Sequence, residues 1–169
     1  MRRQNLWKGM VAGTAAGAVA MTQFQNVWSK VSEKVNGAGA SADGSGQESE
    51  DATMKAAGKV AEATGHTLSH EQKKKAGPLV HYGFGTAMGA LYGTIAELGP
   101  SEVCRHPILS GMGFGSMLFA GADEVAVPAA GLSGKPSESP ASAHIYALAS
   151  HLVYGATTGA LRRIVRAAI

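Results

Sequence analysis

Four long runs without a formal charge dominate this sequence of 169 residues, and they constrain its fold more than any other feature. A helix needs about 20 residues to cross the hydrocarbon core of a bilayer. Three of the runs reach that length, and the third in order continues past two acids as an apolar segment. We therefore predict an all-α integral membrane protein with four transmembrane helices. They are expected over residues 6–28, 77–98, 107–130 and 140–165.

Composition supports this prediction and excludes other classes. The chain is 45% apolar but only 6% aromatic, and 23 of its residues are Gly. A net charge of +3 is too small to indicate nucleic-acid binding. The single Cys104 excludes an intramolecular disulfide and a cysteine-based zinc site. His66 and His70 have a spacing that suits a metal, but no third ligand is evident, so we expect no metal and no cofactor.

Polarity divides the chain into three parts. Residues 1–29 are predicted to form the first transmembrane helix, with a cleaved signal peptide ending at Ala18-Val19-Ala20 as the alternative. Residues 30–75 form a polar connector that is poorly ordered over residues 36–50 and includes a possible surface helix in its second half. Residues 76–169 contain the other three transmembrane helices.

An internal repeat relates the second and fourth predicted helices. Residues 81–91 align without a gap on residues 151–161, with His81 on His151 and a shared Ala-Leu at the end. More weakly, residues 9–14 align on residues 111–116. Because two helices return the chain to its starting side, we predict two parallel two-helix repeats.

Rows of Gly spaced four apart mark one face of every predicted helix. Small residues at this spacing allow helix backbones to approach closely in lipid. We expect these rows to be packing faces, and spare rows to bind further copies or partner transmembrane helices. A direct functional use, such as close approach of a ligand, is the alternative. The glycine-zipper residues are Gly9, Gly13, Gly17, Gly85, Gly89, Gly93, Gly111, Gly115, Gly155 and Gly159.

Ionisable side chains gather at one predicted depth. Asp123, Glu124, His81 and His144 all fall near the same end of their helices, and His151 and Tyr154 lie further in. We predict Glu124 and His144 as the central pair. Consecutive helical residues point about 100° apart, so Asp123 is expected to cap the helix or face headgroups instead. The set is either an interfacial polar belt or a proton- or ion-responsive site, because His and paired carboxylates titrate in acid.

The segment over residues 113–163 resembles the YagU-like inner-membrane proteins, a family defined by a domain of unknown function. The matching residues are Asp123, Glu124, Pro128, Gly131, Leu132, His144, His151, Tyr154, Gly155 and Arg163. The resemblance implies a small multi-pass protein of the bacterial inner membrane and a link to survival in acid, but no known reaction. Phe119–Ala122 is smaller than the bulky run usual before the acids. All the arginines fall on the side of both termini, which places that side in the cytoplasm.

No nucleophile elbow, phosphate loop or cysteine pair occurs, so we do not expect an enzyme. The leading hypothesis is an inner-membrane protein that responds to protons or ions through its acid–histidine cluster. The alternative is a structural or accessory subunit whose Gly faces pack against helices of a larger membrane complex.

Overall fold

The computed structural model describes the backbone of residues 4–39 and 50–169, and the side chains of residues 4–23 and 50–169. All regular structure within these ranges is helical. The elements are α1 (Leu6–Gly39), α2 (Ala52–Ala63), α3 (His70–Leu98), α4 (Ser101–Arg105), α5 (Pro107–Leu118), the π-helix η1 (Phe119–Ala126), α6 (Val127–Ala129), the 3-10 helix η2 (Pro136–Glu138) and α7 (Ala141–Ala168). Of the segment expected to be poorly ordered, residues 36–39 belong to α1 and residues 40–49 lie outside the described residues.

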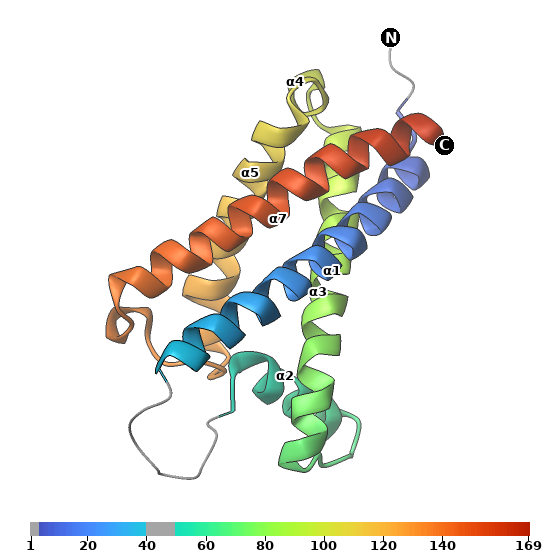
Figure 1. The fold of residues 1–169 in the computed structure, drawn as a ribbon. Helices are drawn as coiled ribbons and strands as arrows, with labels where there is room; N and C mark the ends of the chain where they lie inside the picture. The colour runs from blue at the N-terminus through green and yellow to red at the C-terminus, as the bar shows by residue number, and fades with distance from the viewer. Residues whose placement is uncertain (1–3, 40–49) are drawn as a thin grey trace.

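Helices α1, α3, α5 and α7 form a bundle in which α1 pairs with α3, α5 pairs with α7, and α7 also packs on α1 (Figure 1). The start of α1 and the end of α7 lie together at the same end of the bundle as α4. The opposite end holds α2, η1 and the connection into α7. This arrangement gives the molecule a terminal end and a connector end, and each carries its own cluster of charged side chains.

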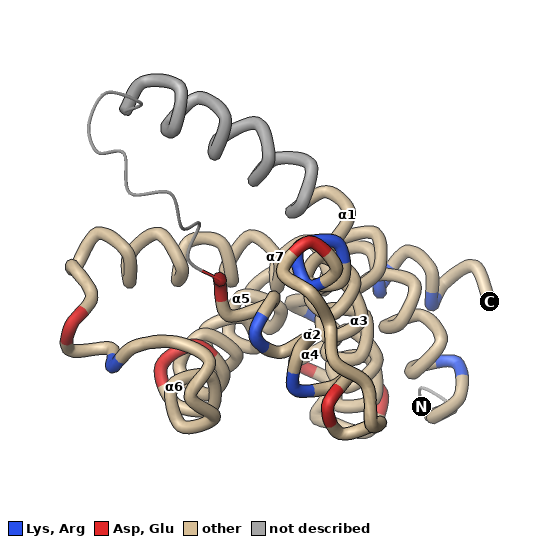
Figure 2. Tube along the Cα trace, turned by 90° about the horizontal axis from the view of Figure 1, so that it is seen from below, with Lys and Arg blue, Asp and Glu red and all other residues tan. Residues whose placement is uncertain are grey.

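The structure corrects the membrane prediction. Among the described residues, no helix is both long enough and apolar enough to span a bilayer. The prediction of four transmembrane helices is therefore wrong, and so is the multi-pass location in a bacterial inner membrane with cytoplasmic termini. Figure 2 shows that much of α7 carries no charged position, but an uncharged run is not necessarily an apolar one. Gly, Ala, Ser, Thr and His supply much of these runs, and they contribute little hydrophobic transfer energy.

The third predicted span shows a second reason. After α5, which is 12 residues long, the α-helix gives way to η1. At 1.5 Å per residue α5 alone rises about 18 Å of the roughly 30 Å hydrocarbon core. The rest of the expected span follows without a break as the π-helix η1, which carries two acids, and the three-residue helix α6.

The polar connector includes one helix that the sequence only suggested. Asp51 caps α2 by accepting the Met54 N–H at 2.8 Å. Met54 and Ala57 are buried in the contact of α2 with the start of α3. Met54 therefore anchors α2 on α3. A capping box formed by Ser69 and Gln72 then begins α3.

Both helix pairs approach closely through the predicted Gly rows. In the α1–α3 pair, a Cβ added to Gly13 would lie 2.2 Å from the carbonyl oxygen of Gly89. In the α5–α7 pair, a Cβ on Gly111 would lie 2.1 Å from the carbonyl oxygen of Gly155. No side chain fits at such distances, so only Gly permits these backbones to approach so closely. All ten glycine-zipper residues lie at these two interfaces, and Gly85 meets the Met21 side chain there.

The helix contacts contradict the weaker sequence match, in which residues 9–14 were aligned on residues 111–116. Gly85 and Gly155 occupy matching positions if His81 corresponds to His151. Gly85 faces Gly17, because a Cβ on Gly17 would lie 2.8 Å from the Gly85 carbonyl oxygen, whereas Gly155 faces Gly111. Gly111 therefore corresponds to Gly17 and not to Gly9. The weaker match is displaced by two helical turns, because Gly at every fourth position looks the same in several registers.

We predict that Gly89→Ala destabilises the protein by about 1–3 kcal/mol, because the new methyl group would lie 2.5 Å from the Gly13 carbonyl oxygen. The matched control is Gly83→Ala on the same helix, where a Cβ meets no atom within 4 Å. That control should stabilise by about 0.5–1 kcal/mol through helix propensity. Chemical denaturation of both variants measures the difference, and equal effects would show that the Gly row is not a packing face.

Candidate functional site

A π-helix presents two consecutive acids at the connector end of the bundle. η1 contains Asp123 and Glu124 and continues directly from α5. In a π-helix the i→i+5 hydrogen bonds enlarge the turn, so consecutive side chains lie closer in direction than in an α-helix. Both carboxylates consequently reach the neighbouring helix α7. Short π-helical segments of this kind are frequent at functional sites.

Glu124 binds His144 near the start of α7. The Glu124 carboxylate oxygen Oε1 and the His144 ring nitrogen Nδ1 are 2.6 Å apart. The other ring nitrogen, Nε2, lies 3.0 Å from the Pro136 carbonyl oxygen, so both ring nitrogens have an acceptor. A protonated imidazole donates from both nitrogens, and this environment suits that form. The Glu124 hydrogen bond is accordingly the main cause that raises the pKa of His144, against the opposing effect of burial.

Asp123 makes a second contact with α7 two turns further along. Its Oδ2 lies 3.6 Å from His151 Nδ1, which also contacts the Ala147 carbonyl oxygen at 2.9 Å. The expectation that Asp123 would cap the helix or face headgroups is therefore wrong, and the geometry of η1 explains why. We refer to Asp123, Glu124, His144 and His151 as the acid–histidine clasp, because these four side chains join η1 to α7.

His81 brings α3 to the same site. It lines a small cavity of about 30 Å³ together with His151 and Tyr154. Burial is the main cause that lowers the pKa of His81, while Asp123 raises it and His151 lowers it. Burial also raises the pKa of Asp123, against the attraction of His151 and His81. The pKa values of His81 and Asp123 therefore each depend on the charge of the other and on the neighbouring His151.

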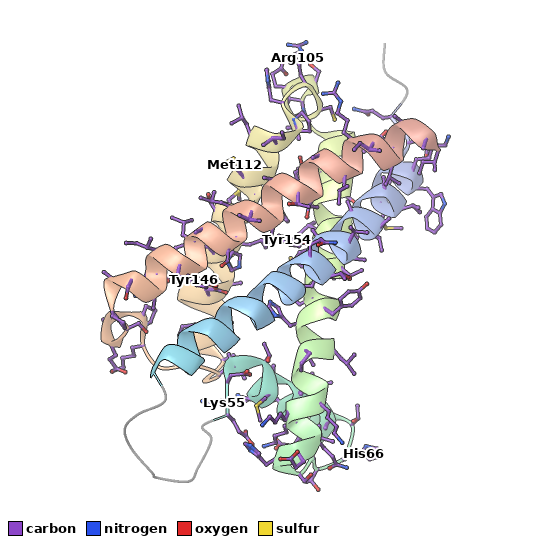
Figure 3. All side chains as sticks on the ribbon, viewed as in Figure 1. Lys55, His66, Arg105, Met112, Tyr146 and Tyr154 are labelled. Carbon is purple, nitrogen blue, oxygen red and sulfur yellow. The ribbon has the colours of Figure 1, made fainter. Side chains whose placement is uncertain are left out.

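Tyr154 connects α7 to α3 just inside this group. Its hydroxyl donates a hydrogen bond to the Gly85 carbonyl oxygen. Burial raises the pKa of Tyr154 to about 12, so the phenol stays neutral throughout the range in which His titrates. Figure 3 shows Tyr154 midway along the bundle, where α7 lies close to α1 and α3. The hydrogen bond from Tyr154 therefore joins α7 to α3 independently of pH in this range, next to the titratable side chain of His81.

A larger cavity of about 150 Å³ opens on the other side of the clasp. Asp123, Glu124 and His144 line it, with Ser133 and Ser139 from the connection into α7. Such a volume holds several water molecules, and the polar lining offers them partners. Protons from solvent can therefore reach the clasp. Within the described residues, no three His, Cys, Asp or Glu side chains are arranged to hold a metal ion.

A second cluster, at the terminal end, was missed by the sequence analysis. Glu97 near the end of α3 is 1% exposed, and its carboxylate accepts hydrogen bonds from Arg162 and Arg166 of α7. It also accepts the backbone N–H of Asn5 at 2.9 Å. We call these residues the Glu97 cluster; it joins α3, α7 and the chain just before α1. The sequence analysis used the arginines only to orient the chain, although the spacing of four between Arg162 and Arg166 was a readable signal.

Neither the Glu97 cluster nor the clasp contains an activated nucleophile or a nucleotide-binding loop among the described residues. Compared with family models, curated proteins and solved structures, the chain matches none of them. The resemblance to YagU-like proteins therefore stays a prediction. Function has to be argued from the chemistry of the site itself.

We predict that Glu97→Gln destabilises the protein by about 3–5 kcal/mol, because it leaves two guanidinium groups without their buried counter-charge. The matched control is Glu102→Gln, which affects only exposed contacts with Arg105 and Ser101 and should change stability little. Thermal unfolding monitored by circular dichroism compares the two. A Glu97 effect no larger than that of the control would mean that the cluster is not a determinant of the fold.

Proposed function

We propose that this protein is proton-responsive, with the acid–histidine clasp and His81 as the responding groups. The observation that carries the proposal is the pair of carboxylate–histidine contacts between η1 and α7, at 2.6 and 3.6 Å. Histidine is the side chain whose ordinary pKa falls between pH 5 and 8. A cluster of three His and two carboxylates that links three helical elements converts a change in pH into a change in helix contacts.

Folding shifts the pKa values of His144 and His81 in opposite directions. Because the pKa of His144 is raised above its ordinary value of 6.5 in the folded protein, its contribution to stability is fully present below that value. That contribution is lost as the pH rises through the folded-state pKa. The pKa of His81 is lowered instead, so protonation of His81 is disfavoured in the folded state and stability is lost as the pH falls below 6.5.

Acidification should therefore strengthen one contact and weaken another. Protonation of His144 makes its hydrogen bond to Glu124 charge-assisted, so the contact between η1 and α7 becomes stronger. At the small cavity, His81 becomes positive beside His151, with Asp123 and Asp51 as the acidic groups that act on it. The raised pKa of Asp123 means that this carboxylate is neutralised at a higher pH than an ordinary Asp and compensates the charge on His81 less. The expected response is that α3 separates from α7 and η1 at this level.

We predict that two histidine variants have opposite pH profiles of thermal stability between about pH 8 and about pH 5. His144→Asn should lose more stability relative to wild type in acid, because it removes the charge-assisted bond to Glu124. His81→Asn should gain stability relative to wild type in acid, because it removes the buried imidazole that resists protonation. His106→Asn, at an exposed position, is the control and should follow the wild type.

A double-mutant cycle of His144→Asn with Glu124→Gln measures the interaction free energy between these two side chains. The coupling between the two substitutions should be larger at about pH 5 than at about pH 8. Parallel pH profiles for wild type and all three histidine variants would contradict the proposal.

We propose helix binding as a second function, on a separate observation. Large apolar side chains point outward from the bundle, including Leu91 and Ile95 of α3, Met117 of α5, Val153 of α7 and Trp7 of α1. Exposed apolar surface on this scale marks interaction sites. An accessory role, in which these faces pack against helices of a larger complex, accounts for it.

We predict that the purified chain associates, either with itself or with a co-purified helical partner, and that Leu91→Gln with Ile95→Gln weakens this association. Both positions are about half exposed, so the double variant should keep most of its thermal stability. Light scattering coupled to size-exclusion chromatography gives the mass. A stable complex with other chains favours the accessory role, and a monomer without partners at micromolar concentration rules it out.

A further inference from the structure

One apolar face of α3 is left uncovered in the folded chain. We call it the α3 stripe, and it consists of Phe84, Leu91, Ile95 and Leu98. Each of these side chains is between 43% and 55% exposed. Their separations of seven, four and three residues put them on one side of the helix. Residues 76–96 carry no formal charge, so most of the surface around the α3 stripe is uncharged as well.

The internal repeat shows that the corresponding face of α7 is covered. In the repeat register Phe84 corresponds to Tyr154 of α7. Tyr154 is only 5% exposed, because it packs in one apolar cluster with Ala20 and Met21 of α1. Helix α1 therefore covers on α7 the face that lies open on α3. The start of α1 and the end of α7 lie at the same end of the bundle, so the covering helix is antiparallel (Figure 1).

A bulky residue explains why α5 does not cover α3 in the same way. Helix α5 corresponds to α1 in the repeat, and Phe114 of α5 stands where α1 has Ala20, since Gly111 corresponds to Gly17. The Phe114 ring lies against the Tyr92 ring of α3, with 5.3 Å between the ring centroids. These two rings lie between the backbones, so α5 stays away from α3 and the α3 stripe remains open.

We propose that the α3 stripe binds the α3 stripe of a second copy of this chain, in an antiparallel homodimer; this rests on the helix binding proposed above and names its partner. Two identical faces that meet about a twofold axis bring like charges together, which is costly. The α3 stripe avoids this cost because it carries no charge. A second copy also supplies what the repeat lacks at this place, an antiparallel apolar helix, and one contact covers both open faces.

Large and small residues alternate along this face of α3 at the spacing of a coiled-coil seam. The seam consists of Phe84, Ala87, Leu91, Thr94 and Leu98. In an antiparallel pair whose twofold axis lies level with Gly89, Leu91 of one copy meets Ala87 of the other. Phe84 of one copy then meets Thr94 of the other. A large side chain lies opposite a small one in each of these layers, so the two seams interlock.

The first test fills the small position of the seam. Ala87 is exposed in the single chain, so Ala87→Leu should leave the fold intact by circular dichroism. In the dimer the larger side chain collides with Leu91 of the other copy, so the dissociation constant from analytical ultracentrifugation should rise about tenfold. Val153→Leu is the matched control, because it enlarges an exposed apolar residue of α7 and should leave the dissociation constant unchanged. Association through unspecific apolar contact would instead be strengthened by Ala87→Leu.

The second test reads the orientation by disulfide cross-linking. Ala87→Cys and Leu91→Cys are made separately in a Cys104→Ser background, mixed and oxidised, and intact-mass spectrometry distinguishes the three covalent dimers. The mixed dimer should form fastest, because only positions 87 and 91 lie at the same level. Two cysteines at position 87 are offset by four residues, about 6 Å along the axis, which is too far for the 3.5–4.5 Å that a disulfide requires between Cβ atoms.

The outcomes separate this inference from the helix binding on which it rests. A dimer that Ala87→Leu weakens and that cross-links between positions 87 and 91 supports the second copy. A stable complex with a different chain overturns the second copy and leaves helix binding in place, whereas a monomer without any partner contradicts both. A dimer that Ala87→Leu does not weaken, or that cross-links fastest between identical positions, overturns the antiparallel α3 contact.

Discussion

Direct contact between helix backbones is the constraint on which the rest of this structure depends. In the α1–α3 and α5–α7 pairs, Gly stands where any side chain would collide with a carbonyl oxygen of the partner helix. Helices that approach this closely have little room between them for large residues. The buried apolar residues are accordingly mostly Ala, with Met21, Met54, Tyr92 and Tyr154 as the larger ones in the described part of the chain. The bulky apolar side chains are left on the outside.

The same closeness explains why both polar clusters lie at ends of the bundle. A carboxylate and an imidazole need space and access to water or to counter-charges, and the Gly-lined interfaces offer neither. At the terminal end, Glu97 meets Arg162 and Arg166 just past the Gly rows. At the connector end, η1 departs from α-helical geometry and carries both acids to α7. One end is thus held by a buried, strongly paired charge, and the other by partly buried carboxylates and histidines.

Sequence reasoning reached the helices and their Gly faces because a spacing of four is readable without a structure. It also brought Glu124 and His144 to one depth by counting residues along two helices. It failed on hydrophobicity, because runs without charge that consist largely of Gly, Ala and Thr were taken to be apolar enough to span a membrane. Asp123 was misplaced because the calculation assumed an α-helical turn, and the residues of η1 give no signal for a wider one. Glu97 was overlooked because it stands at the edge of an uncharged run, where a charge looks like the end of a helix.

A bundle that is held together by backbone contact responds to temperature in an unusual way. The heat capacity change of unfolding grows with the apolar surface that becomes exposed. Here the interior is largely Gly and Ala, and many of the large apolar side chains already lie on the surface of the folded chain. Unfolding therefore adds less apolar surface to water than it would in a domain with a core of Leu, Ile and Phe. The stability of this protein should change with temperature along a flatter curve than is typical for its length, with cold and heat affecting it more gradually.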